Sequence, residues 1–279
     1  MRFLAVIAAI PASCLGFVAC LLYVSSYPFA GRERRQIQFN VAKVYGLPTH
    51  SEFSKNFVRQ NILTQLLLML ETIKGIFWPS AIEISGADEA KKILNAACEN
   101  SGIILISAHV GSWELLGREV SKALARPFYG LAKPSQSKWL TQILNEIREK
   151  MGAKVLWTDS PNLFQNMQNV TDSQGVLGFI MDQRPKNRKS GHPCVFLGVP
   201  DSHIARGPVF MAVQKNLPVC GIYLARTGRC QYRIYVSEIL SAGHGVVDQL
   251  KVAQLMADDM SRMIKMFPEQ WSWNYRRWK

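Results

Sequence analysis

A histidine and a glutamate five positions apart, His109 and Glu114, are the residue types that general-base chemistry requires. The apolar run 102–107 before them is typical of a buried strand, Gly111 permits a tight turn, and Ser112 is suited to cap a helix. The imidazole would then lie at the mouth of a sheet, with the carboxylate one turn into the next helix. Glu114 would accept a hydrogen bond from one ring nitrogen while the other nitrogen takes a proton from an incoming hydroxyl group. The pair predicts a general-base dyad that needs no protein nucleophile.

The spacing of this pair is weak evidence when taken alone. The chain has five histidines, and roughly 7% of its residues are acidic, so an accidental match has a chance of about one in three. An ordinary loop histidine, with an acid near the positive end of a helix, fits the same residues. The residues alone therefore leave catalysis and structure as equal alternatives.

Four other side chains are candidates for contact with a substrate. Arg148 lies beside the apolar stripe of a predicted helix over 137–151, where its planar guanidinium suits a phosphate or a carbonyl group. The alternative is a surface arginine whose stem packs on the helix. Asp182 and Gln183 follow an apolar strand, which is a usual place for site residues, although they would serve equally well to hold a loop. Trp113 is expected to pack beside the dyad.

Signatures of metal, nucleotide and disulfide chemistry are missing from the sequence. His192 and His203 flank a predicted strand, but no third ligand with a recognised spacing accompanies them. The six cysteines form no Cys-x-x-Cys pair, which suits buried thiols in a reducing compartment. No Gly-x-Ser-x-Gly elbow, P-loop or dinucleotide fingerprint occurs, which argues against a serine esterase, a kinase and a nicotinamide enzyme. We therefore expect no metal and no cofactor.

The amino-terminal stretch 3–31 has no charged residue and is followed by a basic cluster at 32–35. Its most apolar part, 3–24, would be about 33 Å long as a helix, enough to cross a hydrocarbon core of about 30 Å. Three arginines follow the stretch and one precedes it, which favours a cytoplasmic remainder. A cleaved secretory signal is the alternative. We expect a single-pass anchor over 1–31 and one domain over 32–279.

The rest of the chain alternates short apolar runs with amphipathic helices, which is typical of an α/β fold whose mostly parallel sheet is covered by helices. Strands are expected over 102–107, 127–131, 154–157, 175–181, 193–197, 218–225 and 231–236. Helices are expected over 36–78 with a break at Pro48 and an end at Pro79, and over 88–98, 112–124, 137–151, 207–215 and 247–267.

The chain carries 33 basic and 20 acidic residues, a formal net charge of +13. So positive a surface attracts anionic lipid head groups, phosphorylated glycolipids and acidic carrier proteins. Neither a zinc finger nor an aromatic RNA-binding signature is present, so nucleic acid is not an expected partner.

The segment 107–114, Ser-Ala-His-Val-Gly-Ser-Trp-Glu, resembles the His-x-x-x-x-Asp/Glu motif of the glycerolipid acyltransferase superfamily, in the form found in bacterial lipid A biosynthesis acyltransferases. Further segments resemble that family in order along nearly the whole chain: 32–35 with Asn40, 132–134 with 144–148, 178–183, 195–198 and 268–279. The family more often has an aromatic residue after the histidine and Asn before the tryptophan, where this chain has Val110 and Ser112.

The resemblance implies a glycerol-3-phosphate acyltransferase-like domain behind one transmembrane helix, on the cytoplasmic face of the cell inner membrane. It also implies transfer of a fatty acyl group from an acyl carrier protein thioester, or from acyl-coenzyme A, to a hydroxyl of a lipid A precursor. His109 would be the base and Glu114 its partner, while Arg148 or backbone amides near Gly111 would face the developing oxyanion. Two other functions stay open: acylation of a different glycolipid or a phospholipid, and a non-catalytic, lipid-binding membrane scaffold.

Overall fold

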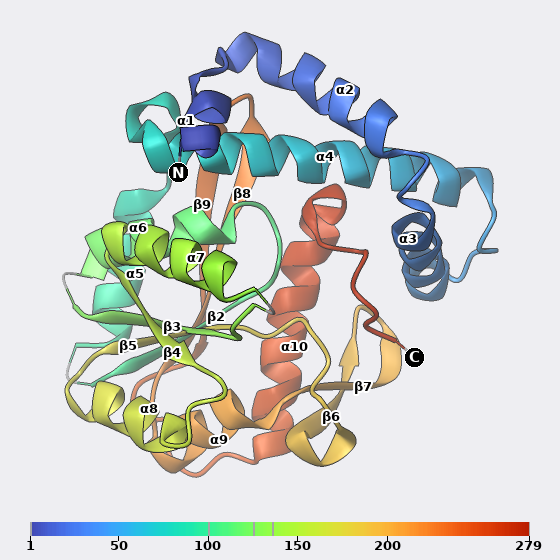
Figure 1. Cartoon of the computed structure of the whole chain (residues 1–279). Helices are drawn as coiled ribbons and strands as arrows, with labels where there is room; N and C mark the ends of the chain where they lie inside the picture. Colours follow the sequence, from blue (N-terminus) through green and yellow to red (C-terminus); the bar gives the residue numbers. More distant parts are fainter. Residues whose placement is uncertain (1, 100, 125, 136, 279) are drawn as a thin grey trace.

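A seven-stranded sheet lies at the centre of the computed structural model, which describes residues 2–99, 101–124, 126–135 and 137–278 (Figure 1). The strands are β1 (Glu83–Ser85), β2 (Ile103–Ser107), β3 (Phe128–Ala132), β4 (Ala153–Trp157), β5 (Val176–Ile180), β6 (Gly191–Phe196), β7 (Val199–Ala205), β8 (Val219–Gly228) and β9 (Gln231–Leu240). The sheet order is β1-β9-β8-β2-β5-β3-β4, and only the pair β8–β9 is antiparallel. β6 and β7 form a separate antiparallel hairpin.

Helices cover both faces of this sheet (Figure 1). They are α1 (Arg2–Ala9), α2 (Leu15–Ser26), α3 (Gly31–Tyr45), α4 (Glu52–Phe77), α5 (Ala87–Ala97), α6 (Trp113–Leu124), α7 (Lys138–Lys150), α8 (Leu163–Asp172), α9 (Arg206–Gln214) and α10 (Gln249–Met266). Residues of α8, α9 and α10 pack on one face, and residues of α4, α5 and α6 pack on the other. The expected α/β class, with a mostly parallel sheet between helices, is confirmed.

The central strand β2 shows why the apolar runs of this chain become strands. Ile104 and Ile106 pack into the core on the side of α10, whereas Ile103 and Leu105 pack into the core on the side of α5 and α6. All four are at most 1% exposed. Because side chains of a strand alternate between faces, a continuous apolar run is what a strand buried on both sides requires.

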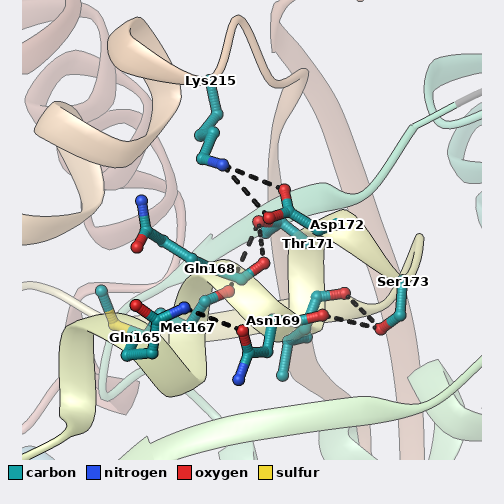
Figure 2. Close-up of polar contacts among 9 residues, drawn as sticks. Gln165, Met167, Gln168, Asn169, Thr171, Asp172, Ser173 and Lys215 are labelled. Carbon is teal, nitrogen blue, oxygen red and sulfur yellow. Dashed lines mark hydrogen bonds and ion pairs between the residues drawn. The ribbon is translucent and has the colours of Figure 1, made fainter.

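Sequence patterns missed three elements. β1 has three residues, too few for a periodic signal, and β7 carries polar residues such as Asp201 and Ser202. α8 is rich in Asn and Gln, and its side chains pair along its own surface, as in the hydrogen bond between Gln165 and Asn169 (3.0 Å; Figure 2). Figure 2 also shows Lys215, just beyond α9, reaching the carboxylate of Asp172 at 3.1 and 3.2 Å. The expected strand over 193–197 belongs to the β6–β7 hairpin and not to the central sheet.

The single amino-terminal helix expected over 3–24 is interrupted at Pro11, and α1 and α2 lie across α4 (Figure 1). Proline lacks an amide hydrogen, so the helical hydrogen bonds cannot continue through it. The carbonyls of Ala8 and Ile10 each accept a hydrogen bond from Lys74 Nζ of α4, at 2.8 Å. The break is therefore stabilised by the domain on which these helices pack.

In the part of the chain that the structure describes, no single helix has the length and apolar character to cross a membrane. Two segments, Ala12–Ser26 and Gly31–Tyr45, meet that test together by length and composition only, and they are bent by 105°.

Glu71 of α4 ties this helix to the β8–β9 hairpin. The side chain is fully buried, and its carboxylate accepts hydrogen bonds from Arg226 Nε (2.9 Å) and Nη2 (3.0 Å). The same carboxylate also accepts from the Cys230 amide (3.1 Å) and the Tyr232 hydroxyl (2.8 Å). Four donors compensate for the loss of hydration, which a buried charge requires.

We predict that Glu71→Ala lowers the free energy of unfolding by roughly 3 kcal/mol, because it leaves Arg226 without its counter-ion. Denaturant unfolding followed by circular dichroism measures the change. Glu52→Ala is the matched control on the same helix, since the exposed pair of Glu52 with Lys55 (3.6 Å) should contribute at most about 1 kcal/mol. Equal losses in the two variants would contradict a special role for the buried network.

Candidate active site

The segment after β2 makes the tight turn that its sequence predicts. Gly111 has a φ of +63°, and a Cβ there would collide with the carbonyl oxygen of Leu224 on β8. The Gly111 amide donates to the carbonyl of Gln270 (3.3 Å), and the Ser112 amide donates to that of Leu224 (3.0 Å). These contacts start α6 beside the sheet and leave His109 at the end of β2, with its side chain 21% exposed.

Asp182 is the hydrogen-bond partner of His109. The distance from His109 Nδ1 to Asp182 Oδ1 is 2.8 Å. β2 and β5 are parallel neighbours in which Ser107 pairs with Ile180, so the residues two positions further on emerge side by side. The other carboxylate oxygen of Asp182 accepts a hydrogen bond from Trp271 Nε1 at 2.6 Å. Asp182 thus joins the end of β2 to the carboxyl-terminal segment.

Glu114 forms a different pair from the one expected. Its two carboxylate oxygens accept hydrogen bonds from Arg148 Nε (3.0 Å) and Nη2 (2.5 Å) of α7, in a bidentate ion pair. Among the described residues, the hydrogen bond that orients the His109 ring comes from Asp182 and not from Glu114. Strand pairing brings Asp182 to the ring, whereas Glu114 lies on the first turn of α6, opposite α7.

Charges around the ring set its protonation. Burial favours the neutral imidazole, but the charge and hydrogen bond of Asp182, together with the charge of Glu114, raise the pKa of His109. Burial opposes ionisation of Asp182 as well, yet His109 and the Trp271 indole keep the pKa of this carboxyl below its ordinary value. A carboxylate only accepts hydrogen bonds, so Nδ1 of His109 carries the proton and Nε2 is available as a base when the ring is neutral.

Trp113 and Gln183, two other expected site residues, differ in their surroundings. Trp113 packs edge-on against His109, with ring centroids 5.0 Å apart, as expected of a packing residue. Gln183 is exposed, and it makes no side-chain hydrogen bond to another described residue. Sequence reasoning did not identify Trp271 as a partner of the site, because nothing in its local pattern links it to a strand end 89 residues away.

The carboxyl-terminal segment that carries Trp271 is held by amide side chains of two helices. Asn40 Nδ2 of α3 donates to the carbonyls of Trp273 and Tyr275, both at 2.7 Å. Asn61 Nδ2 of α4 donates to two more carbonyls of this segment, including that of Trp271, both at 2.8 Å. The Ser272 amide donates to the His109 carbonyl at 3.1 Å. The segment therefore fixes both the ring and its carboxylate.

A mostly apolar cavity adjoins the Glu114–Arg148 pair. Its walls come from β2, α6, β3, α7, β4 and β5, and include Leu105, Leu116, Val120, Phe128, Gly130 and Met151. Trp113, Glu114 and Arg148 also line it, so the cavity begins next to the residue that packs on His109. No group of three or more His, Cys, Asp or Glu residues that could hold a metal ion occurs within the described residues.

We predict that Asp182→Asn lowers the pKa of His109, because the charge that stabilises the imidazolium is removed. Titration of the histidine ring by NMR measures this change directly. Asp172→Asn, which alters an exposed carboxylate on α8, should leave the pKa of His109 unchanged. An unshifted His109 titration in Asp182→Asn would show that Asp182 does not set its protonation.

Comparison with known proteins found similar sequences over nearly the whole chain. The family model for bacterial lipid A biosynthesis acyltransferases matches residues 1–279. The chain is 21% identical over 277 residues to the lipid A biosynthesis palmitoleoyltransferase of Escherichia coli (strain K12), covering 97% of this chain and 86% of that protein. It has the same identity and coverage with a lipid A biosynthesis acyltransferase of Shigella flexneri. The resemblance seen in the sequence is thereby confirmed, and the chain belongs to the bacterial lipid A biosynthesis acyltransferase family.

Proposed function

We propose that this acyltransferase moves a fatty acyl group from the thioester of an acyl carrier protein to a hydroxyl group of a lipid A precursor, with His109 as the general base. The observation that carries the proposal is the hydrogen bond of His109 to the buried carboxylate of Asp182, beside an apolar cavity that begins at Glu114 and Arg148. Family membership supplies the reaction class.

The proposed chemistry needs one base that is later an acid. Nε2 of His109 takes the proton of the acceptor hydroxyl as its oxygen forms a bond to the thioester carbonyl carbon. The tetrahedral intermediate then expels the thiolate, which receives the same proton from the imidazolium. The C–S bond breaks, a C–O ester bond forms, and the free thiol leaves. Asp182 holds the tautomer that this cycle requires, and general acid–base catalysis contributes about 10²- to 10⁴-fold.

Glu114 and Arg148 act together in this proposal. The negative charge of Glu114 raises the pKa of His109, which makes the ring a stronger base. The bidentate ion pair holds the guanidinium of Arg148 at the cavity wall. Its Nη1 has no hydrogen bond to the described residues, so it is a donor available to the oxyanion of the intermediate. The proposed catalytic group is therefore His109 with Glu114, oriented by Asp182.

The apolar cavity is the proposed site of the acyl chain. Gly130 of β3 lines it, and a Cβ at this position would meet no atom within 4 Å. The space beside Gly130 is thus open for methylene groups of the donor.

The donor and the membrane are proposed from charge and exposed apolar surface. An acyl carrier protein is acidic and suits a chain of formal charge +13, and the phosphates of acyl-coenzyme A would suit it too. Phe17, Leu21 and Val24 of α2 are 53–68% exposed, and Phe29 is 86% exposed. These side chains would enter the cytoplasmic leaflet of the inner membrane while the basic cluster 32–35 meets anionic head groups. Membrane association in this form does not require one straight spanning helix.

We predict that His109→Gln lowers kcat/KM for acyl transfer by about 10²- to 10⁴-fold, because no other group takes the proton. Purified protein, a labelled acyl thioester and a lipid A precursor provide the assay, with product detected by mass spectrometry. His50→Gln, an exposed histidine before α4, is the control and should be as active as the wild type.

The pH profile tests the same assignment. Neutral His109 is the reactive form, so kcat/KM should fall as pH drops through its raised pKa, and the Asp182→Asn variant should move this acid limb to lower pH.

Unchanged transfer by His109→Gln would refute the assignment of His109 as the base. A wild-type protein that binds lipid but transfers nothing would favour a scaffold.

We predict that Gly130→Leu shifts the donor preference to shorter acyl chains, because the leucine side chain would fill space in the cavity that a long acyl chain needs. Each methylene group of the acyl chain that can no longer be buried there would lose about 0.8 kcal/mol of binding free energy. Competition between thioesters of several chain lengths, read out by product mass, measures the shift. Gly207→Leu on α9 is the control, since a Cβ there also meets no atom within 4 Å but lies outside the cavity. An identical product distribution in Gly130→Leu would place the acyl chain elsewhere.

A further inference from the structure

A second cavity, of about 480 Å³, lies between α3, the loop after β5, the β6–β7 hairpin and the carboxyl-terminal tail. Figure 1 shows the tail running beside β7 toward the end of the chain. Its volume is in the range of roughly 300–1,000 Å³ that is usual for ligand sites. Five cationic side chains and one carboxylate, that of Asp201, line it; the cations are Lys43, Arg184, Lys186, Arg188 and Arg277. This basic cavity shares no lining residue with the apolar cavity.

Arg277 is the unusual member of the basic cavity because it is buried without a counter-ion. It is only 3% exposed, its Nη2 donates to the carbonyl of His203 at 2.7 Å, and its guanidinium lies 4.7 Å from the ring centre of Phe196. Its Nε is buried with no hydrogen-bond partner, and it forms no ion pair with a carboxylate of the described residues. Burial lowers the pKa of Arg277 accordingly.

Arg118 is the other buried arginine among the described residues, and like the half-buried Arg148 and Arg226 it is paired with a carboxylate. Arg118 holds Glu119 (2.7 Å), Arg148 holds Glu114, and Arg226 holds Glu71. A buried guanidinium that lacks such a partner keeps an uncompensated desolvation cost, which an anion in the cavity would remove. Arg277 is therefore the buried, uncompensated cation of this cavity, to which the exposed lysine and arginine side chains add charge.

The basic cavity is connected to the active site through the loop after β5. Arg184 follows Asp182 by two residues, and its carbonyl accepts a hydrogen bond from the Tyr275 hydroxyl at 3.4 Å. Arg184 also lines a neighbouring hollow with Arg32 and Arg276, which continues the positive surface to the start of α3. This strip leads from the loop after β5 to the start of α3, near the exposed Phe29, where a lipid head group would lie in the proposed function.

We propose that the basic cavity binds a phosphate group of the glycolipid acceptor and so places its hydroxyl at His109. Planar guanidinium groups match the oxygen pairs of a phosphate, and several cations suit a group that carries up to two negative charges. The acceptor is favoured over the donor because the apolar cavity already serves the acyl chain and because the positive strip approaches the lipid-facing helices. The inference rests on the proposed function for the identity of the acceptor.

The test compares a phosphorylated lipid A precursor with the same lipid after enzymatic removal of its phosphates, using the full-length protein in detergent micelles. In the Lys186→Ala/Arg188→Ala variant, we expect the ratio of kcat/KM for the phosphorylated over the dephosphorylated acceptor to fall at least tenfold. Arg277→Lys, which keeps the charge but loses the planar fork, should lower the same ratio. Lys91→Ala/Lys92→Ala on α5 removes two exposed charges far from the cavity and should leave the ratio unchanged.

Binding measurements separate this inference from the proposed function. The inactive His109→Gln protein should bind the phosphorylated lipid at least tenfold more tightly than the dephosphorylated lipid, and the Lys186→Ala/Arg188→Ala change should remove that difference. If the wild-type protein transfers no acyl group but the preference for the phosphorylated lipid persists, the proposed function is wrong and the phosphate site stands. Three results would overturn the inference. They are equal binding of the two lipids, an increase only in the KM of the thioester donor, and displacement of both lipids to the same extent by free inorganic phosphate.

Discussion

One carboxylate connects the parts of the molecule on which the candidate chemistry depends. Asp182 accepts from the ring of His109 on one oxygen and from the indole of Trp271 on the other. It is almost fully buried, so it is stabilised as an anion only while both donors stay in place. The end of β2, the end of β5 and the carboxyl-terminal segment must therefore be assembled together before the ring has its partner.

The carboxyl-terminal segment is consequently part of the site. Backbone carbonyls of this segment would be unsatisfied without the side-chain amides of Asn40 and Asn61, which come from α3 and α4. α4 is held in turn against the β8–β9 hairpin, because the buried carboxylate of its Glu71 accepts hydrogen bonds from Arg226 and Tyr232 of the hairpin. A chain of polar contacts thus links α3 and α4 to the ring at the end of β2.

Two cavities of opposite character flank the reactive residues. The apolar one begins at Glu114 and Arg148, whose charges neutralise each other in a bidentate ion pair. The basic one contains Arg277, whose charge has no carboxylate partner among the described residues. In the proposed reaction, the acyl chain of the donor and the phosphate of the acceptor would occupy separate cavities, since apolar and anionic groups are stabilised in different surroundings.

The sequence by itself determined the local features: the doubly buried strand β2, the turn at Gly111, the helix that begins near Ser112 and the break at Pro48. These follow from side-chain periodicity and from backbone restrictions within a few residues, which act before any distant contact forms. The sequence also made His109, Glu114, Arg148 and Asp182 candidates for the active site. Only the tertiary structure decided how they pair, because the register of β2 against β5 and the packing of α7 on α6 choose the partners. Hydrogen bonds between residues 73 or 89 positions apart have no local signal, since they depend on which strands become neighbours in the sheet.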